Sequence, residues 1–105
     1  MDLPEARQRL NLIFDFYEAL LTQRQREIFS MHYADDCSLA EIGTVLEITP
    51  QAVADILKRT TARLNKYDEL LGLVEKHERQ KAIISEIKLL TDEKEIIKLL
   101  ENLLI

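Results

Sequence analysis

Apolar side chains recur at intervals of three and four residues along nearly the whole chain, which is the spacing of helices that bury one face. The first such face is formed by Leu10, Ile13, Phe14, Tyr17 and Leu21. This helix is expected to begin near Pro4, because proline is favoured in a first helical turn. A second apolar face follows, formed by Ile28, Phe29, Met31, His32 and Tyr33. The pattern therefore predicts an all-α protein.

Polar residues mark where two of the predicted helices begin. Thr22 is followed three residues later by Gln25, and Ser38 is followed three residues later by Glu41. This is the spacing of a capping box, in which each side chain binds the backbone N–H of the other residue. Between the two helices, Asp35-Asp36-Cys37 is expected to form a turn.

Residues 38–56 are predicted to form a helix-turn-helix. A short helix over 39–46 is followed by a tight connection, and Thr49 then caps a helix that has Pro50 in its first turn and continues to about Tyr67. The two helices of this motif cross steeply, and Gly43 supplies the small residue that a close crossing needs. The side chains expected to fill the angle are Ile42, Leu46, Ile48, Val53 and Ile56. An ordinary helical hairpin is the alternative, which the caps and the Thr-Pro start disfavour.

The C-terminal part stays helical but becomes more charged, with six basic and nine acidic side chains over 68–105. One long helix is predicted from about Leu70 to Ile87, with Gly72 as a weak point near its start. Thr91-Asp92-Glu93 is expected to cap a last helix. Its apolar positions are Ile96, Ile97, Leu99, Leu100, Leu103 and Leu104.

The expected fold is an all-α helical bundle with two parts. Residues 1–67 form an N-terminal helix plus helix-turn-helix domain, and residues 68–105 form a C-terminal helical arm. The arm packs either on the same core or on a second subunit. Its wide apolar stripe favours a homodimer, because a small domain has limited surface on which to bury so many aliphatic side chains.

Composition narrows the class of protein. The formal net charge is −5, and the only cysteine, Cys37, cannot form an intrachain disulfide. The first residues lack the cationic and apolar regions of a signal peptide. No apolar run approaches the ~20 residues that span a bilayer, so we expect no membrane insertion and a cytoplasmic location.

Candidate chemistry is sparse, and we expect neither an enzyme nor a cofactor. His32 and Cys37 are five residues apart, but two ligands do not make a metal site and no second pair lies nearby. Cys37 has no flanking histidine to act as a base for a nucleophile. There is no glycine-rich loop of the kind that holds phosphates.

Several segments resemble region four of sigma factors, which reads promoters: LTQRQREIF over 21–29, YADDCSLAEIG over 33–43, QAV over 51–53 and LKRT over 57–60. With NLIFDFYEALLT over 11–22 ahead of them, the chain more closely resembles the YlxM family of small bacterial helix-turn-helix proteins. The resemblance covers about residues 7–70 with specific segments, and the whole chain in length and helical plan. Such proteins are typically encoded beside the genes for the signal recognition particle GTPase and its receptor, which implies a regulatory or accessory role in that pathway.

The second helix of the motif is the candidate binding element. In DNA-reading proteins this helix enters the major groove with its N-terminal residues on base edges. The candidate nucleic-acid or partner-binding residues are Gln51, Asp55, Lys58, Arg59, Arg63 and Lys66, with Arg24 and Arg26 from the preceding helix. Relatives of the motif commonly have Ser-Arg-Gln where this chain has Thr49-Pro50-Gln51, so an arginine is replaced by proline. Residues 22–67 carry six basic and six acidic side chains, which predicts weak binding to DNA.

Three functions remain open at this point. The first is an accessory protein that binds the signal recognition particle GTPase or its RNA. The second is a DNA-binding transcriptional regulator that binds duplex DNA. In the third, the helix-turn-helix is only a scaffold for dimerisation. The motif is also expected to be winged-helix-like.

Overall fold

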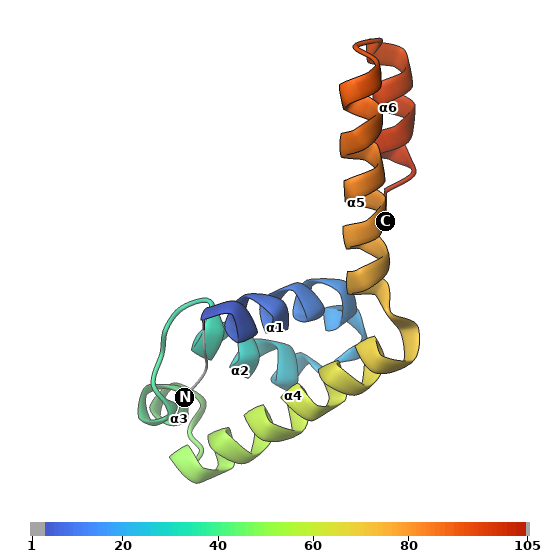
Figure 1. Cartoon of the computed structure of the whole chain (residues 1–105). Coiled ribbons are helices and arrows are strands. Elements are labelled where there is room, and N and C mark those ends of the chain that lie inside the picture. The colour runs from blue at the N-terminus through green and yellow to red at the C-terminus, as the bar shows by residue number, and fades with distance from the viewer. Residues whose placement is uncertain (1–3, 105) are drawn as a thin grey trace. The chain divides into compact units, whose positions relative to one another are not determined.

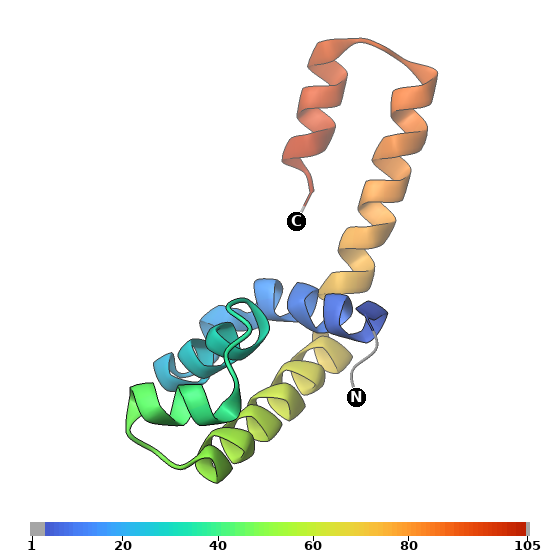
Figure 2. The same cartoon turned by 90° about the vertical axis from the view of Figure 1, so that its left-hand side faces the viewer.

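The computed structural model describes residues 4–104, and these residues contain helices and no strand (Figures 1 and 2). The elements are α1 (Pro4–Tyr17), a short 3₁₀ helix η1 (Glu18–Leu20), α2 (Gln23–Tyr33), α3 (Leu39–Leu46), α4 (Pro50–Leu71), α5 (Leu73–Leu90) and α6 (Lys94–Asn102). The all-α prediction is confirmed. The winged-helix-like description is wrong, because α4 is followed by another helix and not by the β-hairpin that forms a wing.

The chain divides into two compact units, one up to Leu70 and one from Leu71 onward. The boundary predicted between residues 67 and 68 lies inside α4, which continues to Leu71. The helix ends there because Gly72 adopts φ +62°, a left-handed conformation that glycine tolerates well. The long helix predicted from about Leu70 to Ile87 is present as α5, but it begins only after Gly72, which separates it from α4.

In the first unit, α1 lies against α2 and α4. The rings of Phe14 and Phe29 join α1 to α2 at a centroid distance of 4.4 Å. Toward the end of α4, the hydroxyl of Tyr17 donates to Asp68 Oδ1 at 3.0 Å, and Arg9 donates to Asp68 Oδ2 at 3.1 Å. Asp68 is buried, and these bonds compensate for removing its carboxylate from water.

Arg7 attaches α1 to the connection between α2 and α3. Its guanidinium donates to the carbonyl oxygen of Tyr33 at 3.2 Å and to Asp36 Oδ1 at 3.0 Å. The same group lies over the Tyr33 ring, 5.2 Å from the centroid. Asp36 has φ 56°, so the predicted turn at 35–37 includes a left-handed residue.

The predicted caps of the helix-turn-helix are present. The N–H of Gln25 donates to Thr22 Oγ1, and the N–H of Glu41 donates to Ser38 Oγ. In both boxes the longer side chain accepts in return from the N–H of the cap residue. Thr49 Oγ1 accepts from the N–H of Ala52, which completes the start of α4.

The crossing of α3 and α4 depends on Gly43. The N–H of Ile48 donates to the carbonyl oxygen of Gly43 at 2.9 Å, and Glu47 between them is left-handed, with φ 58°. A Cβ on Gly43 would lie 2.6 Å from the Ile48 carbonyl oxygen. Behind this contact lies a core of Ile28, Ile42, Val53 and Leu57, with Leu46, Ile48 and Ile56 packed against it. The predicted filling of the angle is confirmed.

In the second unit, α6 folds back on α5 to form a helical hairpin (Figure 2). Ile84 is buried, and Lys88 forms an ion pair with Glu101 at 2.7 Å. The segment Thr91-Asp92-Glu93 precedes the last helix as predicted, and Glu93 is the N-cap residue of α6, but its side chain forms no cap hydrogen bond. Thr91 ends α5, and its Oγ1 accepts from the N–H of Glu93.

Replacing Gly43 with alanine is expected to destabilise the protein by about 1–3 kcal/mol, the usual cost of forcing extra atoms into a packed site. The added Cβ would meet backbone, which cannot rotate away as a side chain can. Urea unfolding of Gly43→Ala and wild type measures the difference. Thr44→Ala is the control at the neighbouring exposed position, where we expect a change within about 0.5 kcal/mol. Equal denaturation midpoints for wild type and Gly43→Ala would contradict this account of the crossing.

Candidate binding interface

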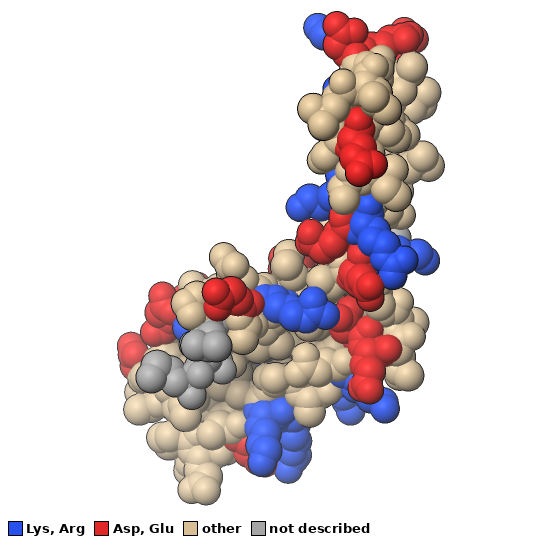
Figure 3. Space-filling view, viewed as in Figure 1, with Lys and Arg blue, Asp and Glu red and all other residues tan. Residues whose placement is uncertain are grey.

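An exposed stripe along α4 contains most of the candidate residues. Val53, Leu57, Thr60 and Leu64 occupy the buried side of this helix. The outward positions are Gln51, Asp55, Lys58, Arg59, Arg63 and Lys66, and all six are exposed. Lys and Arg side chains gather over this part of α4, with an acidic side chain beside them (Figure 3). We call these six residues the α4 stripe.

The charges of the α4 stripe are not equally available. Arg59 forms an ion pair with Asp55 at 2.9 Å, so this arginine already has a counter-charge. Lys58, Arg63 and Lys66 form no ion pair or hydrogen bond within residues 4–104. These three cations are therefore the ones that could neutralise phosphates or carboxylates of a partner without first leaving an acid of their own chain.

The two arginines of α2 differ from each other. Arg26 donates to the carbonyl oxygen of Leu21 at 3.0 Å and to that of Glu18 at 3.4 Å. It therefore holds the connection between η1 and α2, a structural role that the sequence did not reveal. Arg24 is exposed and forms no such bond within the described residues, so it stays a candidate contact.

Comparison with known proteins assigns the chain to a family. A family model described as "Putative helix-turn-helix protein, YlxM / p13 like" matches residues 4–103. The chain belongs to this family, UPF0122. The resemblance derived from segments within 11–60 is thereby confirmed and extends over α5 and α6. The family is described by its helix-turn-helix and not as a family of enzymes.

Curated relatives within UPF0122 span most of both chains. The UPF0122 protein of Geobacillus kaustophilus is 46% identical over 84 residues, which cover 80% of this chain and 76% of the relative. That of Halalkalibacterium halodurans is 42% identical over 99 residues, covering 90% and 91%. That of Bacillus cereus is 43% identical over 91 residues, covering 87% and 83%.

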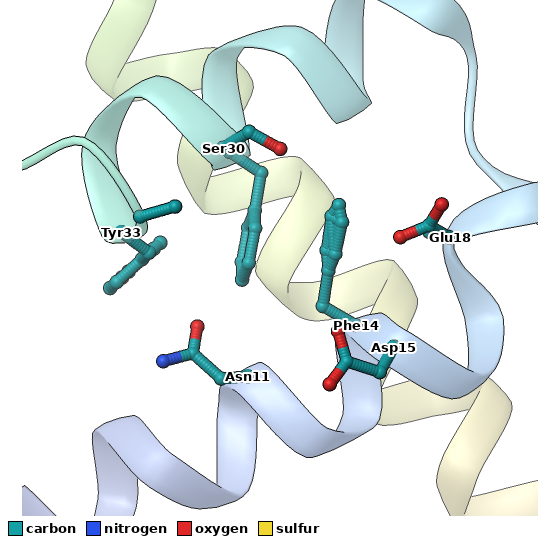
Figure 4. Close-up of a pocket in the computed structure, with 8 residues that line it drawn as sticks. Asn11, Phe14, Asp15, Glu18, Ser30 and Tyr33 are labelled. Atoms are coloured by element: carbon teal, nitrogen blue, oxygen red, sulfur yellow. The ribbon is translucent and has the colours of Figure 1, made fainter.

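This UPF0122 member also has a small pocket between α1 and α2 that the sequence analysis did not anticipate (Figure 4). Phe14 and Phe29 line it together with the polar side chains of Asp15, Glu18 and Ser30. Its volume of about 220 Å³ is below the roughly 300–1,000 Å³ of typical ligand sites. Its lining includes two carboxylates, and no histidine or cysteine.

The pair His32 and Cys37 has a structural explanation. His32 Nδ1 lies 3.0 Å from the carbonyl oxygen of Cys37 and binds the turn that follows α2. Among residues 4–104, no group of three or more His, Cys, Asp or Glu is placed to hold a metal ion. Burial, followed by the nearby carboxylates of Glu41, Asp35 and Asp36, raises the pKa of the Cys37 thiol. A raised pKa disfavours the thiolate, which is the reactive form.

Membrane crossing can be assessed for residues 4–104. None of the helices in this range is both long enough and apolar enough to cross a bilayer.

The Ser38–Glu41 capping box is expected to make stability depend on pH. The backbone N–H and then the hydroxyl of Ser38 lower the pKa of Glu41. A carboxyl whose pKa is lower in the folded state stabilises that state above its unfolded pKa, and this stabilisation is lost as pH falls through the folded pKa. Wild type should therefore be more stable than Glu41→Gln near neutral pH, and the difference should disappear in acid.

Urea unfolding at a series of pH values measures this difference. Glu47→Gln is the control, because Glu47 is an exposed glutamate outside the capping box. A difference between wild type and Glu41→Gln that persists unchanged into acid would rule out the ionised box as its cause.

Proposed function

We propose that this UPF0122 chain is a non-enzymatic accessory protein of the signal recognition particle pathway, and that it contacts the RNA of the particle through the α4 stripe. The observation that carries the proposal is the set of exposed, unpaired cations at Lys58, Arg63 and Lys66 on the second helix of a helix-turn-helix. The pathway itself comes from the YlxM resemblance, with which the family match agrees.

The distribution of charge along α4 favours phosphate contact over reading of bases. Base-reading residues belong at the start of the helix, where this chain has Pro50 and Ala54, which offer only apolar contact, and the acidic Asp55. The unpaired cations lie further along, from Lys58 to Lys66. Lysine and arginine at such positions neutralise phosphates and release counterions, whatever the sequence of the nucleic acid. With few such contacts, binding should be modest and strongly dependent on salt.

A DNA-binding transcriptional regulator is the second candidate function. The observation that favours it is Gln51, which is exposed in the first turn of α4, where a glutamine can make two hydrogen bonds to adenine. Under this function the protein would prefer one duplex sequence, whereas phosphate contact alone gives no such preference.

Fluorescence anisotropy with labelled nucleic acids tests the proposal. The probes are the RNA of the signal recognition particle and a mixed-sequence DNA duplex, each titrated at several salt concentrations; the unlabelled GTPase is added as competitor. We expect RNA binding that weakens with salt, and a triple variant Lys58→Ala/Arg63→Ala/Lys66→Ala that binds weakly. The slope of log K against log salt concentration should be smaller in magnitude than that of wild type by about 2–3, which is near one for each lost phosphate contact.

A matched triple variant, Lys76→Ala/Lys81→Ala/Lys94→Ala, removes three exposed lysines from the second unit and should bind like wild type. If both triple variants bound the RNA more weakly than wild type to the same extent, total charge and not the α4 stripe would determine the affinity. Failure to bind the RNA at low salt would overturn the proposal. Tight binding to one duplex sequence, lost in Gln51→Ala, would establish the second candidate instead.

A further inference from the structure

The helical hairpin of α5 and α6 has one apolar face and one polar face. A groove of about 170 Å³ runs between the helices on the apolar side, lined by Gln80, Ile83, Ile84, Leu100, Leu103 and Leu104. A second hollow on the other side shares Ile84 and Leu104, but its remaining residues are Lys81, Ser85, Lys88 and Glu101. Ile84 and Leu104 thus form the seam of the hairpin, and the two sides differ sharply in polarity.

The apolar face extends beyond the groove. Ile83 is 55% exposed, and Leu90, seven residues later and hence on the same side of α5, is 86% exposed. On α6, Ile97, Leu100 and Leu104 are half-buried, whereas the adjoining row of apolar side chains remains open to solvent. That row consists of Ile96 at 40%, Leu99 at 66% and Leu103 at 73% exposed. Two helices cannot bury an apolar stripe this wide between themselves.

We propose that the apolar face of the hairpin, formed by Ile83, Leu90, Ile96, Leu99 and Leu103, binds the same face of a second copy of the chain. Two antiparallel helical hairpins joined in this way make a four-helix bundle, which buries one stripe of each helix in a common core. In a two-fold dimer the same surface of each copy meets, and an apolar face can pair with its own copy in this way.

Charge identifies a second copy as a suitable occupant. Residues 71–105 contain six Lys or Arg and seven Asp or Glu, interspersed along both helices. This nearly neutral segment offers no strong electrostatic attraction to a strongly basic or strongly acidic partner. Two copies of it, in contrast, can approach without strong net repulsion. The residues lining the groove include no charged side chain, and all of them except Gln80 are apolar, which suits an apolar occupant.

The area available is also suitable. Covering the five exposed side chains on both copies, with the surface around them, removes on the order of 1,000 Å² from water, near the lower end for specific interfaces. Monomeric proteins rarely expose apolar patches of more than a few hundred Å². A dimer would carry two α4 stripes, and simultaneous contact would raise the apparent affinity for one nucleic acid. That consequence rests on the proposed function, whereas the dimer itself does not.

Sedimentation equilibrium of the full chain over the micromolar range tests the proposal without any nucleic acid. We expect wild type to have twice the chain mass of 12.2 kDa. The variant Leu90→Glu/Leu103→Glu should be a monomer, since it places two carboxylates in the interface. Both leucines are largely exposed in one chain, so the variant should keep its fold, as measured by circular dichroism. The control Lys81→Glu/Ser85→Glu adds acidic groups to the polar face and should remain a dimer.

Three results would overturn the proposal. One is a wild type that stays monomeric throughout the concentration range. Another is a dimer that survives Leu90→Glu/Leu103→Glu, which would place the interface on another surface. The third is loss of the dimer in both variants, which would mean that added negative charge and not the apolar face is responsible. Each result is independent of whether the RNA is bound.

Discussion

The contact between Gly43 and the carbonyl oxygen of Ile48 is the constraint on which the first unit depends. It allows α3 and the start of α4 to approach until backbone meets backbone, and the distance left for any Cβ is only 2.6 Å. This approach brings Ile42 and Val53 into one buried cluster. Once that cluster fixes the inner side of α4, the outer side is fixed too, because the two sides alternate along the same helix. The position of the α4 stripe thus follows from one glycine.

The first helix completes this arrangement with polar contacts at two places. Arg7 binds the connection that precedes α3, and Arg9 and Tyr17 bind the buried carboxylate of Asp68 near the end of α4. A helix held by apolar packing alone could shift along its neighbours, whereas a buried carboxylate needs its hydrogen-bond partners at defined positions. α1 therefore couples two segments that are far apart in sequence.

The sequence was informative wherever a local rule decides the structure. The capping boxes at Thr22 and Ser38 and the Thr49-Pro50 start each involve residues at most three apart, and all were predicted correctly. The start of the long C-terminal helix was predicted too early, because Gly72 interrupts the helix and does not merely weaken it. Which of the two a glycine does depends on its tertiary context. The ion pair of Asp55 with Arg59 and the carbonyl contacts of Arg26 were not predicted. The number of charged residues in a sequence does not show which of them already bind a group of the same chain. α5 and α6 were predicted as helices with a wide apolar stripe, but their packing decides which apolar side chains lie between the two helices and which stay exposed.

The small size of α6 has a consequence for the dynamics of the chain. This helix has nine residues and no side-chain cap at its start, whereas an isolated helix needs about 12–15 residues to be even marginally stable in water. Its backbone hydrogen bonds therefore persist only while its apolar side stays packed. Local opening free energies vary widely within one protein, and elements held by few contacts exchange their amide hydrogens first. The amides of α6 should consequently exchange before those of α5. A partner that covers the exposed leucines of α6 would slow this exchange and leave exchange in the first unit unchanged.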